Sequence, residues 1–94
     1  MKIRLSNAAI RDLREAQARI AFDSPTAARQ VILRIQKAVE LIASRPEIGR
    51  LSVDKKTREW SVPGLPYVIP YRTVGDVLEV IRIWHTSRDR PGEW

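Results

Sequence analysis

The chain lacks several residue types on which common protein chemistries depend. Among its 94 residues there is no cysteine, a single histidine and a single methionine. The absence of cysteine excludes disulfides, thiolate metal ligands and cysteine nucleophiles together, and it is compatible with a reducing compartment. One histidine is too few for the usual zinc ligand sets. We therefore expect no metal site.

Long apolar runs and the common catalytic motifs are also missing. No apolar stretch approaches the roughly 18 residues that span a bilayer, and residues 1–7 lack the apolar segment of a secretory signal. We expect a cytoplasmic protein with no membrane partner. There is no phosphate-cradling glycine loop, no Gly-x-Ser-x-Gly elbow and no pair of carboxylates placed for catalysis. We expect no cofactor and no small-molecule substrate.

Basic residues are what the chain has in excess. Its 17 Lys and Arg residues outnumber 11 Asp and Glu residues, which gives a formal charge of +6. Such a charge favours an acidic or polyanionic partner through long-range attraction. A solvated basic surface explains it equally well, because composition does not show which face carries the charge.

The first half of the chain predicts a strand and two helices. Residues 2–6 alternate between apolar and charged, as in a half-buried strand. Apolar residues at helical spacing predict helices over residues 8–22 and 25–44, with Ser24 as N-cap and Pro25 in the first turn. The connection is so short that the helices must form an antiparallel hairpin. Charged residues of the first helix, among them Asp12, are assigned to its solvent side.

The second half predicts a three-stranded antiparallel meander. Its strands cover residues 58–62, 67–72 and 77–84, separated by turns at 63–66 and 74–76. Pro70 removes a backbone donor and favours a bulge. Residues 51–57 are expected to form an exposed loop, and residues 88–94 a basic tail that no apolar periodicity ties to the core. The chain is thus expected to be a single α+β domain, 1–94, with its helices packed on one face of the sheet.

Three segments carry a resemblance to a known family. They are Arg45-Pro46-Glu47-Ile48-Gly49-Arg50, the stretch from Arg58 to Arg72, and Ile81-Arg82-Ile83-Trp84-His85-Thr86-Ser87-Arg88-Asp89. In their order and spacing the chain resembles the RelE/ParE superfamily of bacterial type II toxins, and it is more similar to the ParE-like branch. The resemblance implies the α+β fold derived above, growth arrest by the free toxin, and a cognate antitoxin as partner.

The resemblance leaves two activities open, because both occur on one scaffold. ParE-like members are described as poisoning DNA gyrase, and RelE-like members as cleaving messenger RNA on the ribosome. We expect the first, with the second as the alternative, in which case the protein would be a metal-independent endoribonuclease. A basic nucleic-acid-binding domain without toxicity is a third possibility.

Candidate site residues follow from the chemistry of RNA cleavage, which needs a base, an acid and cations on the phosphate. The candidates for catalysis are Arg58, Arg82 and His85. Candidates for binding nucleic acid or the target are Arg72, Arg88, Arg90, Lys55 and Lys56.

Structural roles compete with each of these assignments. His85 can be a strand-end histidine bonded to backbone or to Asp89, and Arg72 and Arg82 can pair with Glu59 and Glu79. The helical arginines are interpreted as solvent-facing. In a regular strand His85 and Arg82 point to opposite faces, so they reach one site only if the strand bulges or ends before His85.

Overall fold

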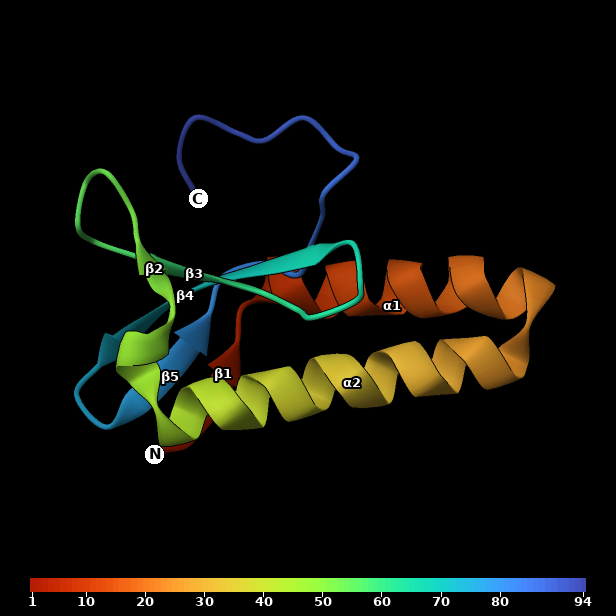
Figure 1. Ribbon diagram of the computed structural model, residues 1–94, viewed down its shortest axis with the longest axis horizontal. Coiled ribbons are helices and arrows are strands. Elements are labelled where there is room, and N and C mark those ends of the chain that lie inside the picture. The colour runs from red at the N-terminus through yellow and green to blue at the C-terminus, as the bar shows by residue number, and fades with distance from the viewer.

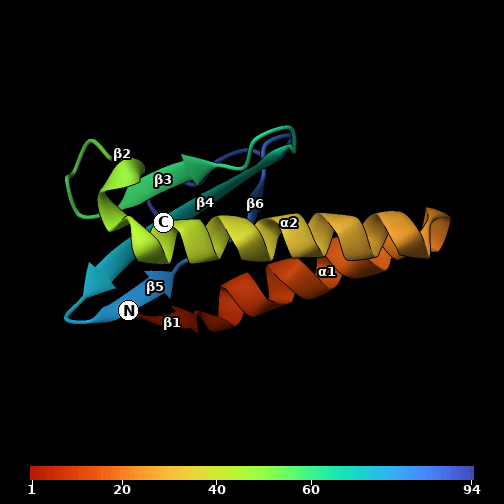
Figure 2. The same cartoon turned by 60° about the horizontal axis from the view of Figure 1, so that its bottom comes forward.

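Two long helices lie side by side on one face of a sheet, and the C-terminal segment lies across its other face (Figures 1 and 2). The computed structural model describes residues 1–94. The elements are β1 (Lys2–Leu5), α1 (Asn7–Asp23), α2 (Pro25–Ser44), the 3₁₀ turn η1 (Pro46–Ile48), β2 (Arg50–Leu51), β3 (Arg58–Ser61), β4 (Tyr67–Val74), β5 (Val77–Val80) and β6 (Trp84–His85).

Both helices begin at serine caps, and Ser24 is the cap that the sequence predicts for the second helix. The Ser6 hydroxyl accepts a hydrogen bond from the Ala9 N–H at 3.0 Å, and the Ser24 hydroxyl accepts one from the Ala27 N–H at 3.1 Å. Each cap satisfies a backbone donor that has no partner within the helix. Neither helix combines the length and apolarity that a membrane span requires. The antiparallel helix hairpin is confirmed.

The sheet order is β1-β5-β4-β3-β2, with β6 pairing with β4. β1 pairs in parallel with β5, and the remaining pairs are antiparallel. The α+β prediction is confirmed, and the meander is extended at both edges. One detail was wrong: the expected loop over residues 51–57 begins within β2, because Arg50 and Leu51 pair with Glu59 and Arg58.

The predicted continuous strand over residues 77–84 was also wrong, because it is broken by a bulge. Tyr71 pairs with Val80 and Val68 pairs with Trp84, so two residues of β4 lie opposite the three residues 81–83. The Pro70 carbonyl accepts from the Ile81 N–H at 2.9 Å. The missing N–H of Pro70 thus faces the interrupted part of the ladder, where proline is tolerated. Because of the extra residue, the side chains after the bulge point to the opposite faces of the sheet from those expected for a regular strand.

Side chains on the helix side of β4 form the centre of the core. Tyr67, Ile69 and Tyr71 are buried there against both helices, as their alternation predicts. The Tyr71 hydroxyl donates to the Pro46 carbonyl at 2.6 Å and accepts from the Gly49 N–H at 2.9 Å. This phenol therefore ties the Arg-Pro-x-x-Gly turn to the sheet.

Glycine is required at position 49 by this close approach. A Cβ atom added there would lie 2.4 Å from the Tyr71 hydroxyl oxygen and 2.7 Å from the ring. We predict that Gly49→Ala lowers the free energy of unfolding by about 2 kcal/mol, the usual size of an overpacking penalty. Gly92→Ala is the matched control, because its Cβ meets nothing within 4 Å. Urea denaturation of both variants measures the difference, and equal stability would contradict the steric argument.

Candidate functional site

Arg82 is bound by a carboxylate of α1. Its Nε donates to Asp12 Oδ2 at 2.7 Å, and its Nη2 donates to Asp12 Oδ1 at 2.9 Å. Asp12 Oδ2 also accepts from the Ile83 N–H at 3.0 Å. The hydrogen bond that Arg82 donates to Asp12 raises the pKa of Arg82 above its ordinary value. Arg82 is therefore a permanently charged structural group in this conformation.

The prediction that Asp12 lies on the solvent side of α1 was wrong, because its side chain is buried. Its exposed fraction is 7%, the lowest of any charged residue in the chain. It lies between Ala9 and Ala16 on the apolar stripe, where a lone carboxylate needs a cationic partner. That position within the stripe is the signal that could have identified it.

The bulge turns His85 toward the helices. His85 pairs with Tyr67 and meets its ring edge-on, with ring centroids 5.2 Å apart. Its Nδ1 accepts from the Ser87 N–H at 3.1 Å and contacts the Ser87 hydroxyl oxygen at 2.6 Å. Ser87, rather than Asp89, is thus the local partner of the histidine. The Arg82 guanidinium also lies 4.8 Å from the centre of the Trp84 ring, so Arg82 and His85 are held by different groups.

Arg58 is anchored by the turn that precedes β2. Its Nη1 donates to the Gly49 carbonyl at 2.9 Å and to the Glu47 carbonyl at 3.3 Å. It pairs with Tyr71 on β4, whereas His85 pairs with Tyr67. Four residues of strand separate these positions by roughly 13 Å along β4. The three catalytic candidates therefore do not share one site.

Arg58 instead shares a basic hollow with three other candidates from the binding group. The hollow has a volume of about 350 Å³ and lies between η1, the loop after β2 and the adjoining part of β4. Its charged lining residues are the cations Lys55, Lys56, Arg58 and Arg72 and one acid, Glu47. Tyr71 also lines it, and burial raises the pKa of this phenol, which therefore stays protonated near neutral pH.

On the open face, the sheet face opposite the helices, arginines are paired with two glutamates. Glu79 accepts from Arg4 Nη2 at 2.6 Å and from Arg72 Nε at 2.7 Å. The hydrogen bond from Arg4 lowers the pKa of Glu79 most, and the one from Arg72 lowers it further. The suggested pairing of Arg72 with a glutamate is therefore correct, whereas the partner of Arg82 is Asp12.

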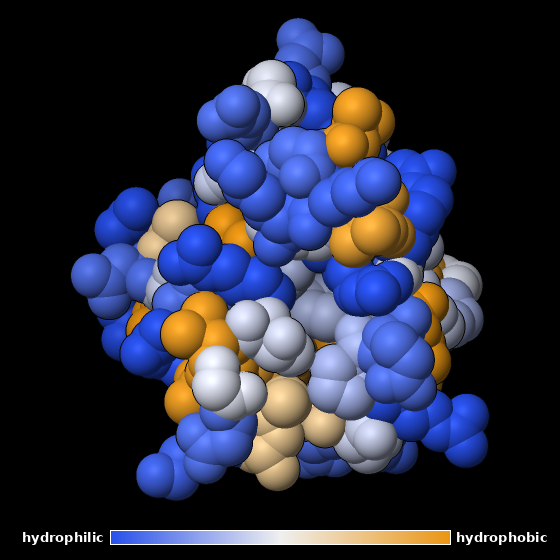
Figure 3. Space-filling view, turned by 90° about the vertical axis from the view of Figure 1, so that its left-hand side faces the viewer, coloured by the Kyte–Doolittle hydropathy of each residue, from blue (hydrophilic) through white to orange (hydrophobic).

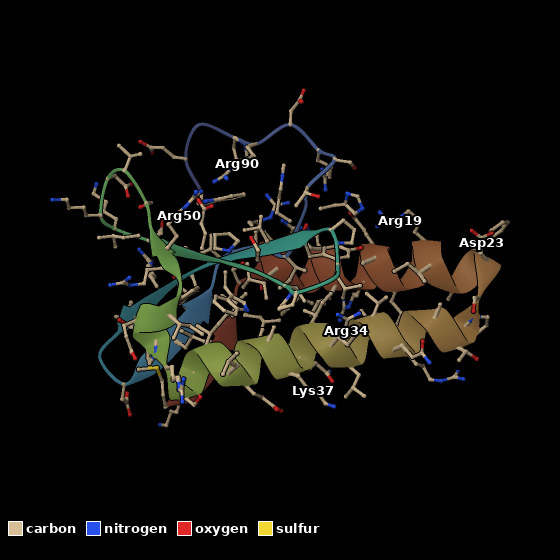
Figure 4. All side chains as sticks on the ribbon, viewed as in Figure 1. Arg19, Asp23, Arg34, Lys37, Arg50 and Arg90 are labelled. Atoms are coloured by element: carbon tan, nitrogen blue, oxygen red, sulfur yellow. The ribbon has the colours of Figure 1, made fainter.

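Glu59 is the second acidic centre of the open face and binds the C-terminal tail. It accepts from Arg90 and from the Trp94 indole N–H at 2.9 Å, and Arg50 lies 3.6 Å away. Figure 4 shows Arg50 and Arg90 on the same side of the sheet. Burial acts to raise the pKa of Glu59, but the hydrogen bonds from Arg90 and Trp94 outweigh it and lower the pKa.

The tail is therefore attached to the domain, contrary to the expectation from its sequence. Trp94 meets Trp84 edge-on at 5.4 Å, and the guanidinium of Arg88 lies 4.7 Å from the centre of the Trp84 ring. Trp84 is buried under these contacts. Trp94 and Glu59 thus hold the tail against the sheet. Contacts of this kind produce no periodic pattern of apolar residues in the sequence.

Two helical arginines that were interpreted as solvent-facing also have structural partners. Arg19 Nη2 donates to the Tyr67 hydroxyl at 2.9 Å, and Arg34 Nη2 donates to the Pro63 carbonyl. Figure 4 shows Arg34 directed from α2 toward the turn between β3 and β4. Both arginines fasten that turn to the helices.

Comparison with known proteins assigns this arrangement to a family. Residues 3–90 match the model of the ParE toxin of the parDE type II toxin–antitoxin system. The chain belongs to this family within the RelE/ParE superfamily. It is accordingly a toxin of a type II toxin–antitoxin system, with an antitoxin as its partner.

Individual relatives agree with this assignment. The chain is 40% identical to the protein Y4kP of Sinorhizobium fredii over 90 residues, covering 96% of this chain and 93% of the relative. It is 35% identical to the toxin RelE2 of Caulobacter vibrioides, covering 85% and 89% of the two chains. A structure described as the chromosomal ParDE system of P. aeruginosa shares the fold, with a TM-score of 0.79, 20% identity, and 90% and 95% of the chains covered.

We predict that Asp12→Ala destabilises the protein by about 3 kcal/mol, because it leaves the Arg82 guanidinium and the Ile83 N–H without their partner. Asp23→Ala is the matched control, since Asp23 is exposed at the end of α1 and should change stability by less than about 0.5 kcal/mol. Chemical denaturation followed by circular dichroism compares the two. A similar small effect in both variants would show that the pair is dispensable.

A second prediction concerns the tail. Because the folded-state pKa of Glu59 is lowered, its contribution is present above the ordinary value of 4.5 and is lost only as the pH falls through the lowered value. At pH 7 the tail should be docked, and Glu59→Gln should speed trypsin cleavage after Arg88 severalfold. Glu93→Gln, an exposed change within the tail, is the control. Equal cleavage rates in the two variants would mean that Glu59 does not hold the tail.

Proposed function

We propose that this toxin arrests growth by binding and inhibiting DNA gyrase, in the ParE-like manner, and not by cleaving RNA. The observation that carries the proposal is the separation of its cations from its histidine. Arg58 lies at the basic hollow with Tyr71, and His85 lies beside Tyr67 at the other end of the same strand.

The groups around the hollow are poorly suited to proton transfer. General acid–base catalysis works best with a pKa near the operating pH, and a base must lie within hydrogen-bond reach of its proton. The phenol of Tyr71 has a raised pKa and is already bonded to the turn. The one carboxylate of the lining, Glu47, stands among four cations, so the hollow chiefly supplies attraction for an anion.

Arg82 also fits a binding toxin better than a nuclease. Two of its nitrogens, Nε and Nη2, already donate to Asp12, and this carboxylate neutralises its charge. A phosphate at Arg82 would therefore meet a paired guanidinium, which attracts an anion less strongly than an unpaired one does.

The test is a DNA supercoiling assay with purified gyrase and purified toxin. We expect the toxin to inhibit supercoiling at concentrations that stop growth, and the cognate antitoxin to restore activity when mixed with the toxin first. A translation extract programmed with messenger RNA is run in parallel. Unaffected gyrase together with cuts within codons, abolished by Arg58→Ala, would replace this proposal with the ribosome-dependent endonuclease.

A further inference from the structure

We infer that the basic hollow binds the phosphodiester backbone of DNA, so that the toxin contacts the DNA that its target enzyme holds. The DNA assignment rests on the proposed gyrase function. The hollow itself is identified by the distribution of charge, by the way its arginine is anchored, and by the conformation of the loop that carries its lysines.

Positive charge is left uncompensated at the hollow more than elsewhere on the sheet. All five ion pairs of the chain lie outside the set Lys55, Lys56 and Arg58. On the open face, by contrast, Glu59 and Glu79 each serve two arginines. Four cations line the hollow against the single acid Glu47, and a concavity with such an excess of positive charge attracts a polyanion from solution.

Arg58 is prepared for an external ligand. The two carbonyls of the turn accept from its Nη1, and no protein group accepts from its Nε or Nη2. The guanidinium is thus fixed in place with donors to spare. Fixing a flexible cation before binding reduces the entropy lost on binding, and a planar guanidinium with two free nitrogens matches a phosphate group.

The loop that carries the two lysines is held in shape by its own hydrogen bonds. The Ser52 N–H donates to the Thr57 carbonyl at 2.9 Å, and the Lys56 N–H donates to Asp54 Oδ1 at 2.9 Å. Lys55 has a φ of 60°, the only positive value at a residue other than glycine. Left-handed backbone at such a residue is strained and is often found where a side chain has a functional position.

The location of the hollow suits contact with an extended polymer. It lies at the end of the molecule formed by η1, the loop after β2 and the β4–β5 turn, which is the end seen in Figure 3. That surface is mainly hydrophilic, with apolar side chains in separated patches. Polar and basic side chains on such a surface can donate hydrogen bonds to phosphate oxygens.

The experiment measures fluorescence anisotropy of a labelled 20-base-pair DNA duplex titrated with purified toxin over a series of KCl concentrations. We expect Lys55→Gln/Lys56→Gln to weaken binding at least tenfold at low salt. The double variant should also reduce the slope of log K against log salt by about 1.8, because each lost phosphate contact removes about 0.9. Arg29→Gln/Lys37→Gln, the matched control, removes the same charge from exposed positions of α2 and should leave binding within about twofold. Figure 4 shows Lys37 on the side of α2 away from the sheet.

Each other outcome overturns the inference in an identifiable way. Equal weakening in both double variants would mean that net charge, and not the hollow, drives binding. Binding of a single-stranded RNA of equal length but not of the duplex would assign the hollow to RNA. No binding of either nucleic acid by the unaltered toxin would remove the hollow as a phosphate site. The supercoiling assay tests gyrase inhibition separately, so its failure is distinguishable from that of the hollow.

Discussion

The contact between Asp12 and the segment Arg82-Ile83 is the interaction on which the arrangement of the sheet depends. One carboxylate accepts two hydrogen bonds from a guanidinium and one from a backbone N–H, across 70 residues of sequence. It fastens α1 to the bulge between β5 and β6. A one-residue shift reverses the facing of every later side chain. This contact therefore determines that Trp84 receives the tail on the open face and that His85 faces the helices.

The same contact is one of several in which an arginine of the sheet serves the fold. Arg82 is bound by Asp12, Arg72 by Glu79 and Arg90 by Glu59. Each of these pairs neutralises charge and fixes an element of the fold. Lys55, Lys56 and Arg58 lack such partners, and they line one hollow together. The formal charge of +6 becomes informative only when the paired and unpaired cations are separated.

Local patterns in the sequence predicted the helices, the Ser24 cap, the strand order of the meander and the burial of Tyr67, Ile69 and Tyr71. These features depend on residues a few positions apart, so periodicity and capping rules capture them. The position of the bulge, the partner of Arg82 and the docking of Trp94 depend on groups 35 to 71 residues apart. Pro70 gave the one local signal for the bulge, and Asp12 within an apolar stripe gave the one signal for its partner. The sequence named the cations that line the hollow but not their grouping, because pairing between distant charges has no sequence period.

The turn at Arg45 to Arg50 connects structural stability with the proposed mode of action. Tyr71 and Arg58 both donate hydrogen bonds to carbonyl groups of this turn. Glycine is required at position 49 because the Tyr71 ring lies too close to the place that a Cβ atom would take. These bonds make the wall of the basic hollow rigid, and they also commit its only phenol to a structural role. A phosphate entering the hollow would meet four cations, of which Arg58 is held by this turn, and one carboxylate, Glu47. A cation that is held in place stabilises a bound anion in its ground state, whereas catalysis requires interactions that strengthen in the transition state. This distinction supports the proposal that the hollow retains a nucleic-acid backbone.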